Sequence, residues 1–147
     1  ELTGIDGFFN SKIVFVSGTE QNKDLFIMDY DGYNVRRITN HHSLILSPDC
    51  SPDGSKIVFN SDKVWNQDIY VLSLLPKIEE KRLIHTGRLA QTAVWSPDGR
   101  KIAYSSGDSD IFVAKCGWKR GCKSHQSPCD RRFPHMVSRW KTNRLCF

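Results

Sequence analysis

Apolar residues along the chain gather in short runs separated by polar turns, and the same kinds of run recur. The first kind, a lysine followed by β-branched or aromatic residues, occurs at Lys12–Ser17, Lys56–Ser61 and Lys101–Ser106. A second kind, which begins with aspartate, follows each of these at Asp24–Asp29, Asp68–Ser73 and Asp110–Lys115. A third, looser kind is found at Val35–Thr39 and Lys81–His85. Because these residue types favour extended backbone, each run predicts a short β-strand.

One turn sequence stands before the second and third copies of the lysine run. It occurs as Ser51-Pro52-Asp53-Gly54 and as Ser96-Pro97-Asp98-Gly99. Proline has the fixed φ that suits the second position of a type I turn, and glycine accepts a left-handed conformation at the end of the turn. The aspartates are therefore predicted to bond the local backbone and not to act as an acid/base pair.

The repeat predicts an all-β fold, a partial β-propeller of about three four-stranded blades. The lysine runs start 44 and 45 residues apart, and a period of this length that contains several short strands is typical of propellers. Alternation within the strands is incomplete, so both faces of each sheet are expected to be covered. The predicted boundaries are 1–116 for the propeller part, with repeats at about 11–50, 51–95 and 96–116, and 117–147 for an irregular tail.

Charge divides the chain at the same place. Residues 1–116 carry 13 Lys and Arg against 15 Asp and Glu, whereas residues 117–147 carry eight against the single Asp130. Four of the five cysteines also lie in the last quarter of the chain, at Cys116, Cys122, Cys129 and Cys146. The net charge of +5 therefore comes from the tail and is no sign of nucleic-acid binding by the repeats.

The tail is predicted to be out of frame. Methionine and tryptophan each have one codon, so Met136 before Val137 places a tryptophan codon one base along, and Trp140 before Lys141 places a glycine codon there. The resulting spacing of tryptophan and glycine is that of Trp95 and Gly99. A frameshift near Cys116 would explain the basic, cysteine-rich composition of the tail, which then serves no function.

The repeats resemble the propeller of the TolB family of translocation proteins. The segment Leu2–Phe8, the run Lys12–Val16 and the segment Asp29-Tyr-Asp-Gly-Tyr-Asn34 carry the likeness, which extends over residues 2–115. The resemblance implies a six-bladed propeller behind a small α/β domain, in the Gram-negative periplasm, as part of the Tol-Pal envelope system. It also implies that the partner is the lipoprotein Pal. The chain departs from the family pattern at Cys50, where a tryptophan is expected.

Binding is expected in the loops that precede the two turns, at 40–48 and 87–94, because such loops gather at one end of a propeller. The resemblance places contact with Pal in the second loop. One subgroup of the family has histidine at the position of Leu89, so the loop carries this prediction more than any single residue does. The predicted partner-binding residues are His41, His42, Gly87, Arg88, Leu89, Ala90, Gln91 and Thr92.

The sequence predicts neither an enzyme nor a cofactor or metal site, and no membrane insertion. The motifs of serine hydrolases, zinc proteases and phosphate-binding loops do not occur. The tail cysteines with His125 and His135 lack the close pairing of zinc ligands, and Asp108 with Asp110 lacks the rest of a calcium loop. Two other interpretations stay open: the non-catalytic propeller of a prolyl-oligopeptidase-like serine peptidase, and a stand-alone propeller of unknown ligand.

Overall fold

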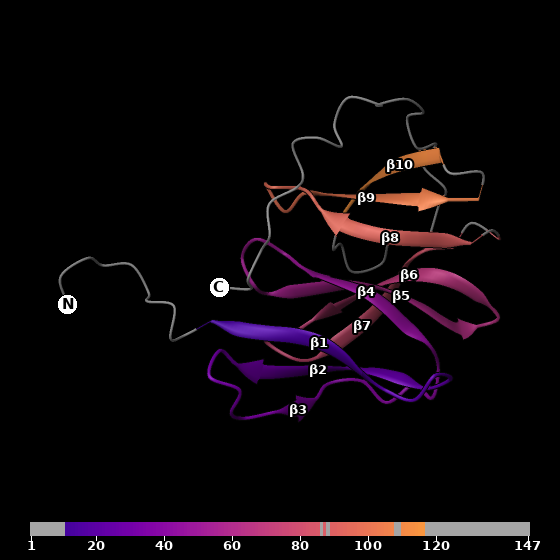
Figure 1. Ribbon diagram of the computed structural model, residues 1–147. Helices are drawn as coiled ribbons and strands as arrows, with labels where there is room; N and C mark the ends of the chain where they lie inside the picture. Colours follow the sequence, from indigo (N-terminus) through magenta and orange to yellow (C-terminus); the bar gives the residue numbers. More distant parts are fainter. Residues whose placement is uncertain (1–10, 86, 88, 108–109, 117–147) are drawn as a thin grey trace.

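The described part of the chain consists of β-strands joined by turns and loops (Figure 1). The computed structural model describes residues 11–85, 87, 89–107 and 110–116. The predicted tail and the first residues quoted for the family resemblance lie outside these ranges. The strands are β1 (Lys12–Gly18), β2 (Lys23–Asp29), β3 (Arg36–Arg37), β4 (Ile45–Cys50), β5 (Lys56–Val64), β6 (Asn66–Ser73), β7 (Glu79–Ile84), β8 (Ala90–Trp95), β9 (Lys101–Ser106) and β10 (Asp110–Lys115). The all-β prediction is confirmed.

These strands form three antiparallel sheets in chain order. The first sheet has the order β1-β2-β3, the second β4-β5-β6-β7 and the third β10-β9-β8. The second and third predicted repeats begin at the turns at Ser51 and Ser96, whereas the second and third sheets begin one strand earlier, with β4 and β8. The reason is that each of these turns joins two neighbouring strands of the same sheet. Thus β4 precedes the Ser51 turn, yet Cys50 pairs with Ile57 across it.

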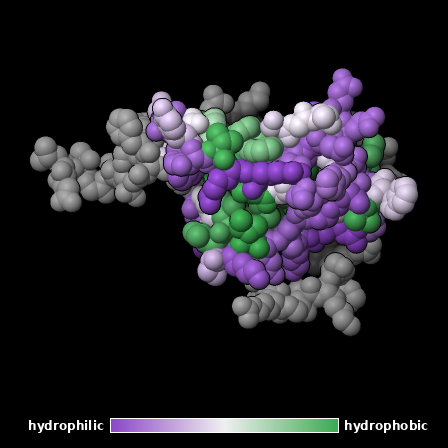
Figure 2. Space-filling view, turned by 90° about the horizontal axis from the view of Figure 1, so that it is seen from below, coloured by the Kyte–Doolittle hydropathy of each residue, from purple (hydrophilic) through white to green (hydrophobic). Residues whose placement is uncertain are grey.

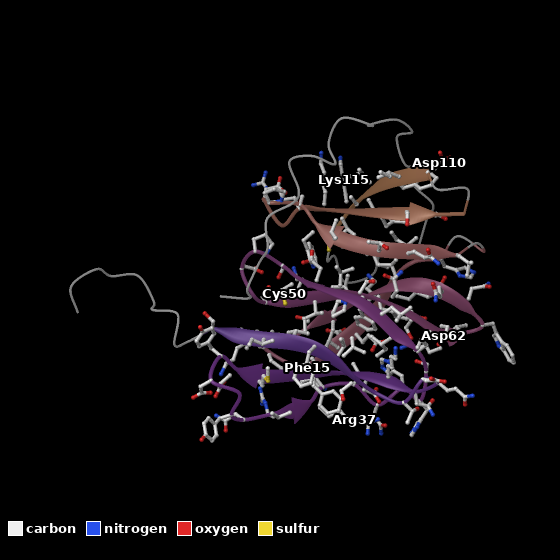
Figure 3. All side chains as sticks on the ribbon, in the orientation of Figure 1. Phe15, Arg37, Cys50, Asp62, Asp110 and Lys115 are labelled. Carbon is white, nitrogen blue, oxygen red and sulfur yellow. The ribbon has the colours of Figure 1, made fainter. Side chains whose placement is uncertain are left out.

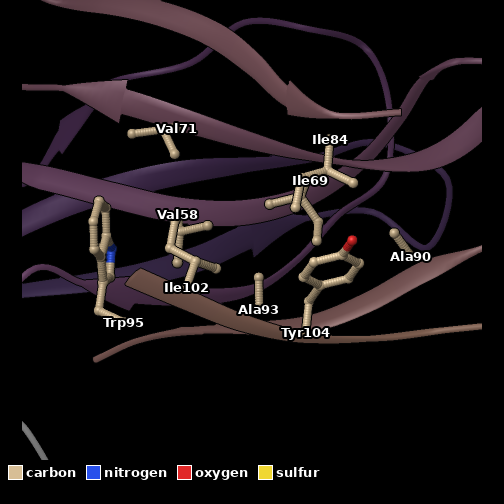
Figure 4. Packing of buried hydrophobic residues seen from close by; sticks show 9 residues of the cluster. All are labelled: Val58, Ile69, Val71, Ile84, Ala90, Ala93, Trp95, Ile102 and Tyr104. Carbon is tan, nitrogen blue, oxygen red and sulfur yellow. The ribbon is translucent and has the colours of Figure 1, made fainter. Parts of the chain in front are cut away.

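The sheets stack face to face, and the core lies in two layers between them (Figure 1). Phe59 and Val58 are neighbours in β5 and point in opposite directions: Phe59 belongs to the cluster shared with the first sheet, and Val58 to the cluster shared with the third. Figure 4 shows the second cluster, in which Trp95 and Tyr104 pack against the second sheet. Both faces of β5 are covered, which explains its unbroken apolar run.

The outer face of the first sheet is also apolar. Val14 and Val16 of β1 pack towards the second sheet, so Ile13 and Phe15, which alternate with them, point away from it. Phe15 stacks on Phe26 of β2 with ring centroids 5.6 Å apart. Figure 2 looks towards this sheet and shows a hydrophobic patch bordered by hydrophilic side chains. The first sheet therefore has apolar residues on both faces, as the sequence predicts for stacked blades.

Candidate functional site

The connections between sheets and the hairpins at 19–22 and 64–66 lie at one end of the stack, here called the loop end. Two backbone hydrogen bonds lie at this end: Lys23 N, after the first hairpin, donates to Ser43 O (3.0 Å), and Gly107 N, directly after β9, donates to Leu89 O (3.0 Å). In Figure 3, Asp62 and Asp110 lie towards this end and Cys50 lies towards the opposite one. Strand direction alone produces this grouping, because every connection from the outer strand of one sheet to the next sheet starts at the same end.

A buried carboxylate fixes the first connection. Asp24, the first residue of its apolar run, accepts hydrogen bonds from Thr39 Oγ1 (2.9 Å), the His41 backbone N (3.1 Å) and Arg37 Nη2 (2.5 Å). Burial on its own would raise the pKa of this carboxyl, but the three hydrogen bonds and the Arg37 charge outweigh it and hold the pKa below its usual value. The carboxylate therefore serves the fold and has few lone pairs left for a ligand.

The second sheet repeats this arrangement at Asp68, whose side chain is fully buried. Its carboxylate accepts from His85 Nδ1 (3.1 Å) and from Arg82 Nη1 (3.3 Å). His85 and Thr39 hold the same place in the repeat, at the end of the third apolar run. We call the two arrangements the aspartate clasps. The sequence contained their signal, an aspartate at the start of one run and a hydrogen-bonding residue at the end of the next, but the pairing was not predicted.

The two predicted histidines differ in exposure. His42 is exposed at φ +52°. His41 is largely buried: its Nε2 lies 2.6 Å from Glu80 Oε2, and its ring stacks on Phe59 at 6.3 Å between centroids. Its Nδ1 is buried without a hydrogen-bond partner among the described residues. Of the pair, only His42 has an exposed side chain.

The buried position of His41 predicts a pH effect on stability. Desolvation lowers the pKa of His41, although Glu80 and Asp24 act to raise it; Lys63 lowers it further. In the unfolded chain the histidine has a pKa of about 6.5, so the unfolded chain takes up the proton first as pH falls. The contribution of the neutral, buried His41 ring to stability is therefore complete above about pH 6.5 and is lost as the pH falls below that value.

We expect the urea midpoint of unfolding to decrease as the pH is lowered from about 7 to about 5. In His41→Gln the midpoint should depend less on pH. His42→Gln is the control and should keep the slope of the parent chain. Equal slopes for the parent and His41→Gln would contradict the assignment.

The second predicted loop combines exposed and buried positions. Leu89 is 53% exposed, and Gln91 and Thr92 are also exposed, whereas Ala90 is fully buried. The side chain of Ala90 therefore offers no exposed surface for binding. Its carbonyl accepts a hydrogen bond from Asn60 Nδ2 of β5 (2.6 Å). Gly87 has φ +68°, and Arg88 lies outside the described residues. Residues 90–94 of this predicted loop belong to strand β8.

Matching β-bulges shape the first strand of the second and third sheets. The register shifts between Leu46 and Asp49 in β4 and between Gln91 and Val94 in β8. Inside these bulges Ser47 has φ +49° and Thr92 has φ +50°. Left-handed backbone is unusual for a β-branched residue such as threonine, and bulges commonly re-aim side chains near binding sites. Next to the β4 bulge, Ser47 and the Gly18 hairpin line a shallow pocket.

The repeats, the stacked sheets and the gathered loops together point to one family. Residues 1–122 match the family model described as the TolB beta propeller domain, PD40. The chain belongs to the TolB β-propeller family.

Individual relatives agree with this assignment. A Tol-Pal system protein TolB from Desulfotalea psychrophila is 32% identical over 114 residues, which cover 76% of this chain and 26% of that protein. A protein TolB homolog from Chlorobium chlorochromatii is 36% identical over 147 residues, covering 71% of this chain and 33% of the relative. This TolB-family chain therefore spans about a quarter to a third of the length of these relatives.

A solved structure confirms the arrangement of the sheets. The crystal structure of TolB from Acinetobacter baumannii matches with a TM-score of 0.61 and 26% identity, over 76% of this chain and 29% of that one. The prediction of a partial TolB-like propeller is thus confirmed, and the three sheets are its blades. Among the described residues the second sheet has the predicted four strands, and the first and third have three each.

The end of the TolB blades opposite the loop end carries the repeated turns. Gly54 N donates to Ser51 O and Gly99 N to Ser96 O, at 2.9 Å in each turn, and both glycines have positive φ. Asp53 accepts from Ser51 Oγ (2.5 Å) and from Ser55 N (3.1 Å). These bonds, the one from Ser51 foremost, lower the pKa of Asp53. The same bonds recur around Asp98, so both turns are built alike.

The described part of this TolB-family chain contains no metal cluster and no membrane-spanning helix. Within it, no group of three or more His, Cys, Asp or Glu side chains is placed to hold a metal ion. Nor does it contain a helix with the length and apolar character required to cross a lipid bilayer. Cys116 is half-buried, and burial raises the pKa of its thiol. The remaining tail cysteines, His125, His135 and Asp108 lie outside the described residues.

Proposed function

We propose that this TolB-family chain is a non-catalytic protein-binding module whose partner, in the periplasm, is a Pal-like peptidoglycan-associated lipoprotein. The observation that carries the proposal is the loop end. There, exposed side chains from several loops share one surface. The aspartate clasps bond the ends of the connections that carry this surface to buried carboxylates. Relatives named as Tol-Pal system proteins support the choice of partner.

Equilibrium binding, without covalent chemistry, fits the state of the polar groups at this end. The carboxylates of Asp24 and Asp68 are buried and bonded within their own sheets, and His41 is bonded to Glu80. The side chains left for a partner include neutral ones such as Leu89 and Gln91, together with His42 and the charged Glu20 of the first hairpin. A surface of this composition resembles the mixed polar and apolar surfaces of non-obligate protein interfaces.

The double variant Leu89→Ala/Gln91→Ala tests the proposed contact. Both side chains are exposed on the same short segment, so their removal should weaken binding about tenfold, which corresponds to ~1.4 kcal/mol, while the fold is kept. Affinity for the soluble domain of the Pal encoded by the same genome would be measured by titration calorimetry.

The matched control is Ile78→Ala, an exposed apolar residue on the β6–β7 connection at the opposite end. It should leave the affinity unchanged. A parent chain that does not bind Pal would overturn the proposed partner, and a loss with Ile78→Ala alone would move the interface to the other end.

A further inference from the structure

The most exposed large hydrophobic side chain in the described part of the chain is Trp65, which is 98% exposed. It stands at the tip of the hairpin between β5 and β6, where Val64 pairs directly with Asn66. The hairpin belongs to the loop end, but its sequence matches none of the repeated runs. Nothing in the sequence pattern drew attention to this residue.

Trp65 is unfavourable for stability in two ways. Its backbone has φ +64°, a conformation that glycine and asparagine adopt readily and that counts as an outlier for a bulky residue. Its indole is exposed to water, where an apolar surface of this size gains nothing from folding. Stability would therefore favour glycine at this position, and the tryptophan calls for an explanation from function.

The base of the hairpin, by contrast, is tightly held. Asp62 Oδ1 accepts from Leu44 N (2.8 Å), which ties the hairpin to the connection between the first and second sheets. The Lys63 ammonium pairs with Glu80 and lies 4.4 Å from the centroid of the Tyr70 ring. The contacts at the base of the hairpin hold the backbone that carries the indole in place. A backbone held in this way reduces the conformational entropy that is lost on binding.

The surroundings of Trp65 indicate what kind of surface it meets. Glu80 neutralises Lys63, and Val64, also exposed, adds apolar area next to the indole. Gln67, two residues further on, accepts a hydrogen bond from Gln91 Nε2 (3.4 Å), which links the hairpin to the second predicted loop. The Asp62 carboxylate at the base of the hairpin keeps its negative charge, so this partly apolar neighbourhood suits a protein surface with an apolar pocket and not a polyanion.

We infer that Trp65 is the anchor of the protein interface at the loop end and inserts its indole into an apolar pocket on the partner. The inference rests on the proposed function and adds the residue that supplies most of the affinity. Tryptophan is among the residues most often found to dominate interface energetics when it is buried by a partner.

Trp65→Gly separates this role from a structural one. Glycine relieves the left-handed backbone, so the urea midpoint of the full-length chain should stay the same or rise. Affinity for the soluble Pal domain should fall at least about tenfold. Trp65→Phe, which keeps an aromatic ring, should have an intermediate affinity. A residue with a merely structural role would instead lower the urea midpoint on substitution.

Fluorescence gives a second readout. The emission difference between the parent chain and Trp65→Phe reports on Trp65 alone, and it should shift to shorter wavelength when Pal is added, because the indole leaves water. An unchanged affinity for Trp65→Gly beside a parent chain that binds Pal would overturn this inference and leave the proposed function standing. A parent chain that does not bind at all would overturn both. A shift caused by soluble peptidoglycan fragments and not by Pal would overturn the assignment to a protein partner.

Discussion

Phe59→Ala is expected to lower the free energy of unfolding by about 4 kcal/mol, close to the whole stability of many small domains. Phe59 is fully buried in β5, between the stacked His41 ring and the Tyr70 ring, with centroids 6.3 and 5.8 Å away. Truncation opens a cavity between the first and second blades that the paired strands cannot collapse to fill. Urea unfolding followed by circular dichroism measures the effect.

Phe112→Ala is the matched control for this prediction. Phe112 lies in β10, is only partly buried, and stacks on Tyr104 at 5.5 Å. The same atoms are removed from a position that water already reaches, so we expect a loss of about 1–2 kcal/mol. Similar losses for the two variants would show that the layer between the first and second blades is no better packed than the outer strand.

Asn60→Ala is expected to damage stability and binding together. Asn60 is buried in β5 and reaches the bulged strand of the third blade: its Nδ2 donates to Ala90 O (2.6 Å), and its Oδ1 accepts from Ala93 N (3.5 Å). Alanine would leave both backbone groups without this partner, at a cost of about 2–3 kcal/mol. Because these groups flank Thr92, the bulge should also relax, and the affinity for Pal should fall several-fold.

Val58→Ala separates the two effects of the Asn60 variant. Val58 lies two residues earlier on the same face of β5 and is fully buried. Its truncation should destabilise the chain by about 2 kcal/mol while keeping the two hydrogen bonds from Asn60 to the bulged strand. Unfolding in urea and calorimetric titration with Pal would be run on both variants. An equal affinity for the two would refute the coupling between Asn60 and the loop.

The strands and the turn chemistry could be predicted because both are local. The run Lys56–Ser61 combines β-branched and aromatic residues whatever surrounds it, and the turn at Ser51 carries its own hydrogen-bonding groups. The offset between repeat and blade was missed for a related reason. The sequence of β4 does not resemble that of β8 closely enough to reveal that each belongs with the strands that follow it.

The candidate site was predictable as a region, while the roles of individual residues in it were not. The orientation of Ala90 is set within the strand that carries the β8 bulge, and its carbonyl bonds to Asn60 from another blade, which the local sequence does not reveal. His41 and His42 are adjacent and chemically identical, yet only one stacks on Phe59. Sequence alone does not single out Trp65, because a lone aromatic residue is usually a core residue, and only the structure shows its exposure and its φ.

The aspartate clasps have a consequence for how such chains change in evolution. Each clasp joins two residues of one repeat, Asp24 with Thr39 and Asp68 with His85. A segment of DNA that encodes one repeat therefore encodes both residues of its aspartate clasp. Unequal recombination that duplicates or deletes whole repeats leaves the remaining ones fastened, so only the packing between neighbours has to be re-established.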